Sequence, residues 1–130
     1  MKQAELNDLG TRYAAAWSSQ NPASLAAFYA DSGSLTVNDG APSVGRAAIT
    51  ATAQAFMTGF PDMLVKMEQV SHEGSHVIFR WLWTGTNTGP GGTGKSVRIQ
   101  GYEAWTLDAQ GMIAESKGHY DAAEYGRQVR

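Results

Sequence analysis

Residues 97–107 read VRIQGYEAWTL and show the strict alternation of a β-strand. With a period of two, one face of this strand carries four apolar side chains and Gly101, and Glu103 lies on that same face. An isolated carboxylate buried in an apolar face would cost more free energy than a small domain can tolerate. Glu103 is therefore expected to be paired with a cation, protonated, or placed beside a cavity, as an active-site acid would be.

Strands are predicted on both sides of this stretch. Residues 76–86 give the strongest strand signal, because they are apolar on both faces except at Arg80, and we expect them at the centre of a sheet. Residues 63–70 and 112–121 alternate in the same way, and residues 34–37 form a shorter strand. Short turns rich in glycine, aspartate and asparagine separate the strands, which predicts a meander.

The N-terminal half is predicted to be helical. Apolar side chains recur at helical spacing in residues 3–18 and again in residues 46–59, where Pro61 prevents continuation. Asn21 and Pro22 begin a short second helix that is expected to run through Tyr29.

Helices followed by a strand meander indicate an α+β domain. We expect the N-terminal helices to pack into a strongly curved, mixed or antiparallel sheet around one cavity. At 130 residues the chain is long enough for a single core, so residues 1–130 are predicted to form one domain.

The composition excludes several classes of function. A net charge of −2 with scattered basic residues argues against nucleic acid as a partner. The chain has no cysteine, and its three histidines have no ligand-like spacing with carboxylates, so we predict neither a metal nor another cofactor. The glycine-rich loop 88–94 joins two strands instead of opening a helix, which argues against a nucleotide site.

Location and assembly are predicted from the same features. The N-terminus has no apolar signal segment and no stretch is long enough to span a bilayer, so we expect no membrane association and a cytoplasmic protein. Charged residues make up only 17% of the chain, below the usual quarter, which suggests that a partner subunit covers part of the surface. We expect a homodimer.

Three motifs resemble those of SnoaL-like polyketide cyclases, in the nuclear-transport-factor-2-like superfamily. Residues 80–89, RWLWTGTNTG, resemble the family's RWxxxGTHTG stretch with Asn87 in place of histidine, and residues 101–107 resemble its GxDxFRx strand. Residues 113–121 resemble the closing strand, whose final aspartate is the acid/base of characterised cyclases. The resemblance implies a cone-shaped, cystatin-like α+β roll and makes Asp121 a catalytic candidate, assisted by His119 on the same side of the strand.

The N-terminal half also resembles the ketosteroid isomerases of this superfamily. In that alignment Tyr13 falls at an oxyanion-hole tyrosine, and Glu103 falls at an acid that is held protonated so that it can donate a hydrogen bond. The isomerases' general base corresponds to Val37, and only a register slip toward Asn38 or Asp39 would restore a base there.

Each candidate also has a structural alternative. Asp121 could be a solvated carboxylate or a helix cap, and Tyr13 could be a core residue. Lys117 or Arg80 could hold Glu103 in a buried ion pair without chemistry. Six apolar or aromatic residues are expected to line a ligand cavity: Trp17, Val37, Phe56, Trp81, Trp83 and Trp105.

We therefore predict a cofactor-independent cyclase or isomerase that performs acid/base chemistry on a small, largely apolar carbonyl compound in an enclosed pocket. The alternative is a dimeric binding module that holds a small hydrophobic molecule without turning it over. A limonene-epoxide-hydrolase-like activity would need an acid two residues after Arg80, and Leu82 occupies that position.

Overall fold

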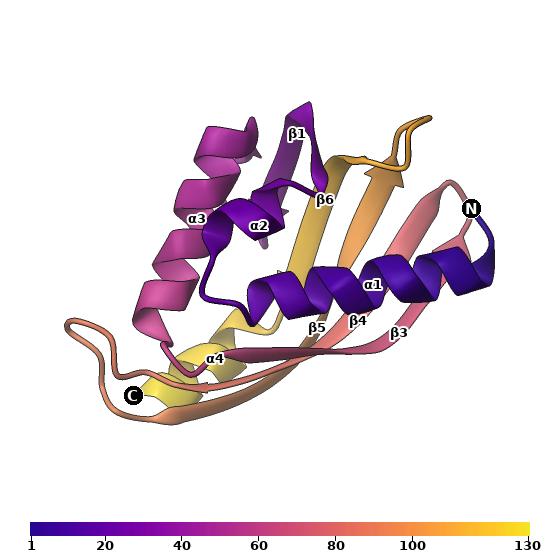
Figure 1. Ribbon diagram of the computed structural model, residues 1–130. Helices are drawn as coiled ribbons and strands as arrows, with labels where there is room; N and C mark the ends of the chain where they lie inside the picture. The colour runs from indigo at the N-terminus through magenta and orange to yellow at the C-terminus, as the bar shows by residue number, and fades with distance from the viewer.

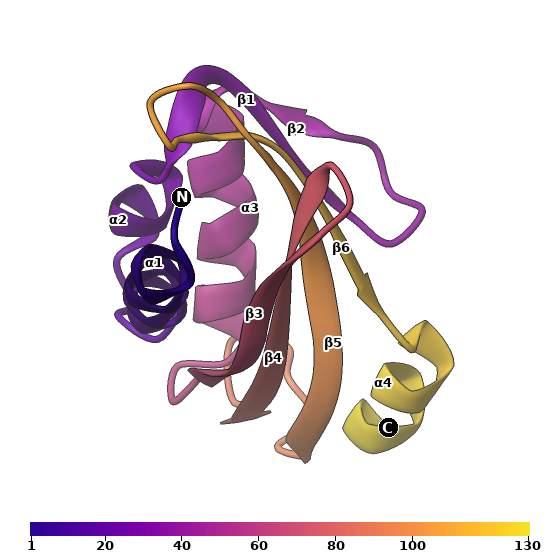
Figure 2. The same cartoon turned by 90° about the vertical axis from the view of Figure 1, so that its right-hand side faces the viewer.

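The computed structural model describes residues 1–130 as an α+β fold in which three helices cover one face of a curved sheet (Figure 1). The helices are α1 (Gln3–Trp17), α2 (Pro22–Ala26), α3 (Arg46–Gly59) and α4 (Ala122–Val129). The strands are β1 (Tyr29–Val37), β2 (Ser43–Val44), β3 (Leu64–Glu73), β4 (His76–Thr86), β5 (Ser96–Leu107) and β6 (Ile113–Tyr120). Helix α4 lies apart from the other helices, directly after β6 (Figure 2).

The six strands form one mixed sheet in the order β2-β1-β6-β5-β4-β3. All neighbours are antiparallel except β1 and β6, which run parallel. Residues 76–86, predicted to be central, form an inner strand next to the edge strand β3, because β6 inserts between β5 and β1 and moves the middle of the sheet to β6 and β5. β4 still has a neighbouring strand on each side, which explains why its residues are so apolar.

Helices α1 and α3 match their predicted spans closely. Helix α1 packs on β3 and buries apolar side chains at the predicted helical spacing. Helix α3 begins after Gly45, whose φ of 87° lies in the left-handed region, and it ends before Pro61.

The second helix is shorter than predicted. Asn21 caps its N-terminus as expected, accepting a hydrogen bond from the Ser24 N–H at 3.4 Å, but the helix ends at Ala26. Tyr29 instead begins β1 and pairs with Ile113 of β6. Its side chain is completely buried, so packing in the core overrides the weak helical signal of the preceding alanines.

The C-terminal tail, for which no helix was predicted, forms helix α4. The Asp121 side chain accepts a hydrogen bond from the Glu124 N–H at 3.0 Å and caps this helix. Tyr125 stacks on Trp83 with ring centroids 5.6 Å apart, and the Gln128 side-chain amide bonds both backbone groups of Arg98 in β5. These contacts hold helix α4 against one end of the sheet.

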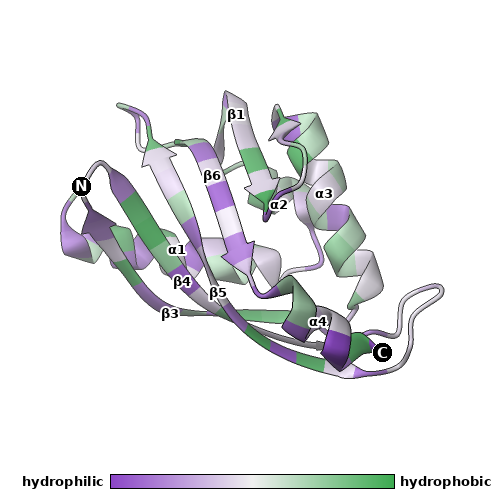
Figure 3. Ribbon diagram, turned by 180° about the vertical axis from the view of Figure 1, so that it is seen from behind, coloured by the Kyte–Doolittle hydropathy of each residue, from purple (hydrophilic) through white to green (hydrophobic).

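The hydrophobic core lies between the inner face of the sheet and helices α1 to α3. Figure 3 shows hydrophilic residues interspersed with hydrophobic ones along β3, and buried and half-buried positions alternate along most of β4, as expected when one face of each strand packs on the core. No helix is both long enough and apolar enough to cross a membrane.

Candidate functional site: a buried carboxylate in an aromatic cavity

A cavity of about 70 Å³ lies between the inner face of the sheet and helices α1 and α3. Nine of its eleven lining residues are hydrophobic. Five of the lining residues are aromatic: Trp17, Phe56, Trp81, Trp83 and Tyr120. Glu103 is the only lining residue with a side chain that carries a charge near neutral pH. The cavity therefore offers a small, apolar space with one acid.

Gly101 makes room for one wall of this cavity. A Cβ atom at Gly101 would lie 2.5 Å from the Trp81 ring, so no other residue fits there without displacing the indole. Trp81 pairs with Gly101 across β4 and β5, two residues from Glu103. The glycine in the strand thus lets the indole lie across the sheet beside the acid.

Glu103 is held through one of its two carboxyl oxygens. Its Oε1 accepts hydrogen bonds from the Tyr13 hydroxyl at 2.7 Å, the Ser116 hydroxyl at 2.7 Å and the Trp105 indole N–H at 3.0 Å. The three donors come from α1, β6 and β5. Because they come from three elements of a packed core, the orientation of the carboxyl group is fixed.

A second tyrosine extends this network. The Tyr29 and Tyr13 hydroxyl oxygens are 2.8 Å apart. Because the Tyr13 proton is directed to Glu103, the Tyr29 hydroxyl is the donor in this pair. Burial, followed by the nearby charge of Glu103, raises the pKa of both phenols well above 10, so both keep their protons.

The second carboxyl oxygen of Glu103, Oε2, receives none of these three hydrogen bonds. Glu103 is one of the residues that line the cavity, so its carboxyl group is accessible from there. Burial raises the pKa of this carboxyl group above its ordinary value of 4.5, while the hydrogen bonds from Ser116, Trp105 and Tyr13 and the nearby Trp17 side chain oppose the rise. Oε2 is therefore the atom that can exchange a proton with a ligand.

The structure contradicts the ion-pair alternative for Glu103. Arg80 pairs with Glu73 at 3.1 Å, and Lys117 lies 4.0 Å from Glu115. Both cations therefore lie on the outer face of the sheet, away from Glu103.

Two predicted site residues lie behind Glu103 instead of in the cavity. Tyr13 is completely buried and does not line the cavity, so its hydroxyl holds Glu103 and cannot reach a ligand as an oxyanion donor. Trp105 is also completely buried, stacked on Phe79 with centroids 5.1 Å apart. Trp17, Val37, Phe56, Trp81 and Trp83 do line the cavity as predicted.

Asp121 and His119 do not converge on this site. Asp121 is exposed and caps α4, because β6 ends one residue before it. His119 is exposed on the outer face, where its ring lies 5.0 Å from that of Tyr102. His119 lies on the side of β6 opposite Ser116, Gly118 and Tyr120, and Asp121 lies beyond the end of the strand. The predicted cluster of Asp121, Tyr13 and Glu103 is therefore not formed.

No register slip restores a base at the isomerase position. Val37 lines the cavity, whereas Asn38 lies in the following turn with a φ of 51°. The Asn38 side chain accepts a hydrogen bond from the Tyr120 N–H at 2.9 Å, and Asp39 is exposed. The first strand contributes only apolar side chains to the cavity.

Two residues of the network were missed in the sequence. Ser116 shares the inward side of β6 with Gly118 and Tyr120, so the period of two could have found it. Tyr29 had no such signal, because it was expected to end a helix.

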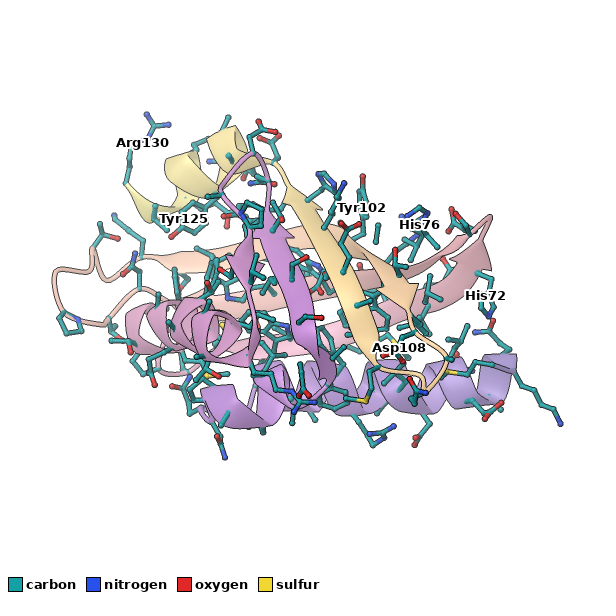
Figure 4. All side chains as sticks on the ribbon, turned by 90° about the horizontal axis from the view of Figure 1, so that it is seen from above. His72, His76, Tyr102, Asp108, Tyr125 and Arg130 are labelled. Atoms are coloured by element: carbon teal, nitrogen blue, oxygen red, sulfur yellow. The ribbon has the colours of Figure 1, made fainter.

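No group of three or more histidine, cysteine or acidic side chains lies close enough to hold a metal ion. His72 and His76 lie at the opposite end of the molecule from Tyr125 and α4 (Figure 4). The candidate site thus consists of the aromatic cavity and the Glu103 network.

Comparisons with known proteins agree with this fold. The SnoaL-like domain matches residues 11–116, which include Tyr13, Glu103 and Ser116. No curated protein matches the chain in sequence.

Solved structures share the fold at low sequence identity. A protein with a ketosteroid-isomerase-like fold from Catenulispora acidiphila, in complex with trimethylamine, has a TM-score of 0.80 at 20% identity over 92% of this chain and 89% of its own. A candidate SnoaL-like polyketide cyclase from Jannaschia has a TM-score of 0.78 at 17% identity over 99% and 96%. TsrD from Streptomyces laurentii has a TM-score of 0.82 at 16% identity over 99% and 97%.

Proposed function

Because the chain belongs to the SnoaL-like family, we propose that it is a cofactor-independent cyclase or isomerase in which Glu103 moves the proton. The observation that carries this proposal is the free Oε2 of a buried carboxyl group facing an apolar cavity. A carboxyl group with a raised pKa is a stronger base than an exposed one and is matched to proton transfer near neutral pH. Its substrate is a small, largely apolar carbonyl compound.

In the proposed reaction, ionised Glu103 removes a proton from the carbon next to the substrate carbonyl. The electron pair of that C–H bond forms an enolate, and the proton stays on Oε2. In an isomerisation Glu103 returns this proton to a different carbon. In a cyclisation the enolate carbon attacks a second carbonyl, whose oxygen becomes an alkoxide and takes the proton from Oε2. The three donors on Oε1 keep the carboxylate in one orientation throughout.

Tyr120 is the best candidate to stabilise the enolate oxygen. Its side chain lines the cavity, and its hydroxyl has no hydrogen-bond partner in the protein. Burial, and the neighbouring Tyr125, raise the pKa of Tyr120, so it keeps a proton to donate. Tyr120 is two residues along β6 from Gly118, which pairs with Glu103, a separation of about 7 Å along the strand. A small substrate fits between the two groups.

A small β,γ-unsaturated ketone tests this proposal. We expect the protein to isomerise 3-cyclohexenone to 2-cyclohexenone, followed by the absorbance of the conjugated product. Replacement of Glu103→Gln is expected to lower the rate about 100-fold or more, because the amide cannot accept the proton. Glu115→Gln removes the same charge from the outer face of β6 and serves as the control.

An unchanged rate in Glu103→Gln, with folding confirmed by circular dichroism, would rule out Glu103 as the base. Tyr120→Phe is expected to lower the rate about tenfold without abolishing it, because one neutral donor is lost.

Binding without chemistry is the second candidate function. It is favoured by the absence of a second carboxylate or a histidine from the cavity lining. The relative from Catenulispora acidiphila is described in complex with trimethylamine, so a protein of this fold holds a molecule of very few atoms. A cavity of about 70 Å³ is consistent with a ligand of this size.

We further propose a homodimer formed through the outer face of the sheet. Ile78 and Leu82 of β4 are only half-buried on that face, and α1 to α3 all lie on the other side (Figure 2). Sedimentation velocity tests this directly, and a monomer at micromolar concentration would refute it.

A further inference from the structure

The aromatic rings around the cavity meet at steep angles. Trp17 and Phe56 meet at 83° with centroids 5.9 Å apart, and Phe56 and Trp83 meet at 89° and 5.8 Å. Trp83 and Tyr120 meet at 77° and 6.3 Å. In an edge-to-face contact one ring presents its edge to the other, so the faces of that ring stay clear of the contact and are available to a third group.

The side chains that line the cavity can contribute only negative charge. No lysine, arginine or histidine lines the cavity, and Glu103 is the only residue there that can carry a charge at neutral pH. The face of an aromatic ring also carries partial negative charge. An ionised Glu103 together with these rings therefore creates a negative potential inside an apolar space.

From these observations we infer that the cavity binds small organic cations, namely quaternary ammonium ions and protonated tertiary amines, with Glu103 as their counter-ion. Cations of this kind bind best to desolvated aromatic faces. The inference rests on the proposed function in one respect only, namely that the cavity binds a ligand. It does not require that this ligand is turned over.

The hydrogen-bonding capacity of the cavity selects among cations. A primary ammonium group has three N–H donors, and the cavity offers it the free Oε2 of Glu103 and the hydroxyl of Tyr120 as acceptors. At least one N–H would then remain buried without a partner, which is unfavourable. A quaternary ammonium has no N–H, and a protonated tertiary amine has one, which Oε2 can accept. Methylated amines are therefore the preferred class.

Cation binding is coupled to the ionisation of Glu103. The titratable groups that face it are the phenols of Tyr13 from α1 and Tyr29 from β1, with Tyr120 of β6 across the cavity, and all three stay protonated at neutral pH. No charged side chain other than Glu103 lines the cavity from β4, β5 or α3. Glu103 is thus the only group here that changes charge, and a bound cation favours its ionised form. At a pH at which Glu103 is partly protonated, binding of the cation therefore releases a proton.

A pair of ligands with the same shape and different charge tests this inference. Choline and 3,3-dimethyl-1-butanol differ in having N⁺ or carbon at the branched centre. We expect isothermal titration at mildly alkaline pH to give an affinity about tenfold or more higher for choline, with chloride held constant by sodium chloride. Titrations of choline in buffers of different ionisation enthalpy are expected to show proton release near neutral pH.

Three variants separate the contributions of the Glu103 charge and of the aromatic rings to choline binding. Glu103→Gln is expected to remove both the preference for choline and the proton release, whereas the control Glu115→Gln keeps both. Phe56→Leu retains an apolar wall but removes a ring face from a half-buried position. It is expected to weaken choline binding about threefold or more while changing binding of the neutral alcohol by less than about twofold.

The result that overturns the inference is equal or weaker binding of choline than of the alcohol, or a preference for choline that Glu103→Gln retains. If the alcohol binds and choline does not, the cavity remains a ligand site and the proposed function is unaffected. If neither binds, the inference fails, and the isomerisation assay decides separately whether the proposed function fails with it.

Discussion

The region around Glu103 and the region around Asp121 are close in the sheet and opposite in environment. Glu103 pairs with Gly118 on β6, three residues before Asp121. Glu103 is 5% exposed, with three donors on one oxygen, whereas Asp121 is exposed and caps a helix. The side of the strand on which a carboxylate lies, and not its distance from the cavity along the chain, decides whether it can act there.

Replacing each carboxylate in turn is expected to give the largest difference in stability between the two regions. Glu103→Leu leaves the buried donors of Tyr13, Ser116 and Trp105 without an acceptor, and we expect it to lower the free energy of unfolding by about 3 kcal/mol. Asp121→Leu removes only a cap and is expected to cost about 1 kcal/mol or less. Urea denaturation measures both, and equal losses would show that the two environments do not differ in energy.

Removal of the hydrogen-bond donor on α1, the Tyr13 hydroxyl, is expected to have a smaller effect on the free energy of unfolding. Tyr13→Phe removes one hydrogen bond to Glu103 and leaves the ring packing between Phe79 and Trp105. We expect a loss of about 1–2 kcal/mol, together with a further rise in the pKa of Glu103 because one opposing hydrogen bond is gone. A loss below about 0.3 kcal/mol would mean that the hydroxyl does not hold the carboxyl group.

The pH dependence of stability distinguishes the two regions without changing the fold. Burial raises the pKa of Glu103 above 4.5, so the folded state holds a proton that the unfolded state has already released. The free energy of unfolding is therefore expected to fall as pH rises from about 4.5 through the raised pKa and to level off above it. Glu103→Gln removes this decline, and Asp121→Asn retains it. A wild-type curve without the decline would contradict the assigned burial effect.

The smallest expected effect is that of Asp121→Asn. Asparagine caps a helix about as well as aspartate, so the melting temperature should change by less than about 2 °C. Because Asp121 lies outside the cavity, isomerase activity should persist. Loss of activity with a normal circular dichroism spectrum would restore Asp121 as the base.

The sequence was sufficient to predict the inward direction of Glu103, the spans of α1 and α3, and five of the eleven residues that line the cavity. Each of these depends on a local period of two or 3.6 residues. The partners of Glu103 depend on strand register, which brings Ser116 and Tyr29 to the same place although they are far apart in the chain. Nothing local specifies that β1 pairs in parallel with β6, so the sequence could not identify this network.

One error was avoidable. Asp121 followed by Glu124 at the third helical position is the pattern that begins a helix, in a tail for which no helix was predicted. This pattern favours the helix-cap alternative for Asp121 over the catalytic role.

The parallel pairing of β1 with β6 also constrains how the chain folds. Leu35 pairs with Ser116, and about eighty residues separate them, so this contact closes a long loop late in the folding reaction. Ser116 is also a hydrogen-bond donor to Glu103. The hydrogen bond from Ser116 to Glu103 therefore forms only when β6, the last strand to be synthesised, has docked, and this docking completes both the sheet and the hydrogen-bond network of the candidate site.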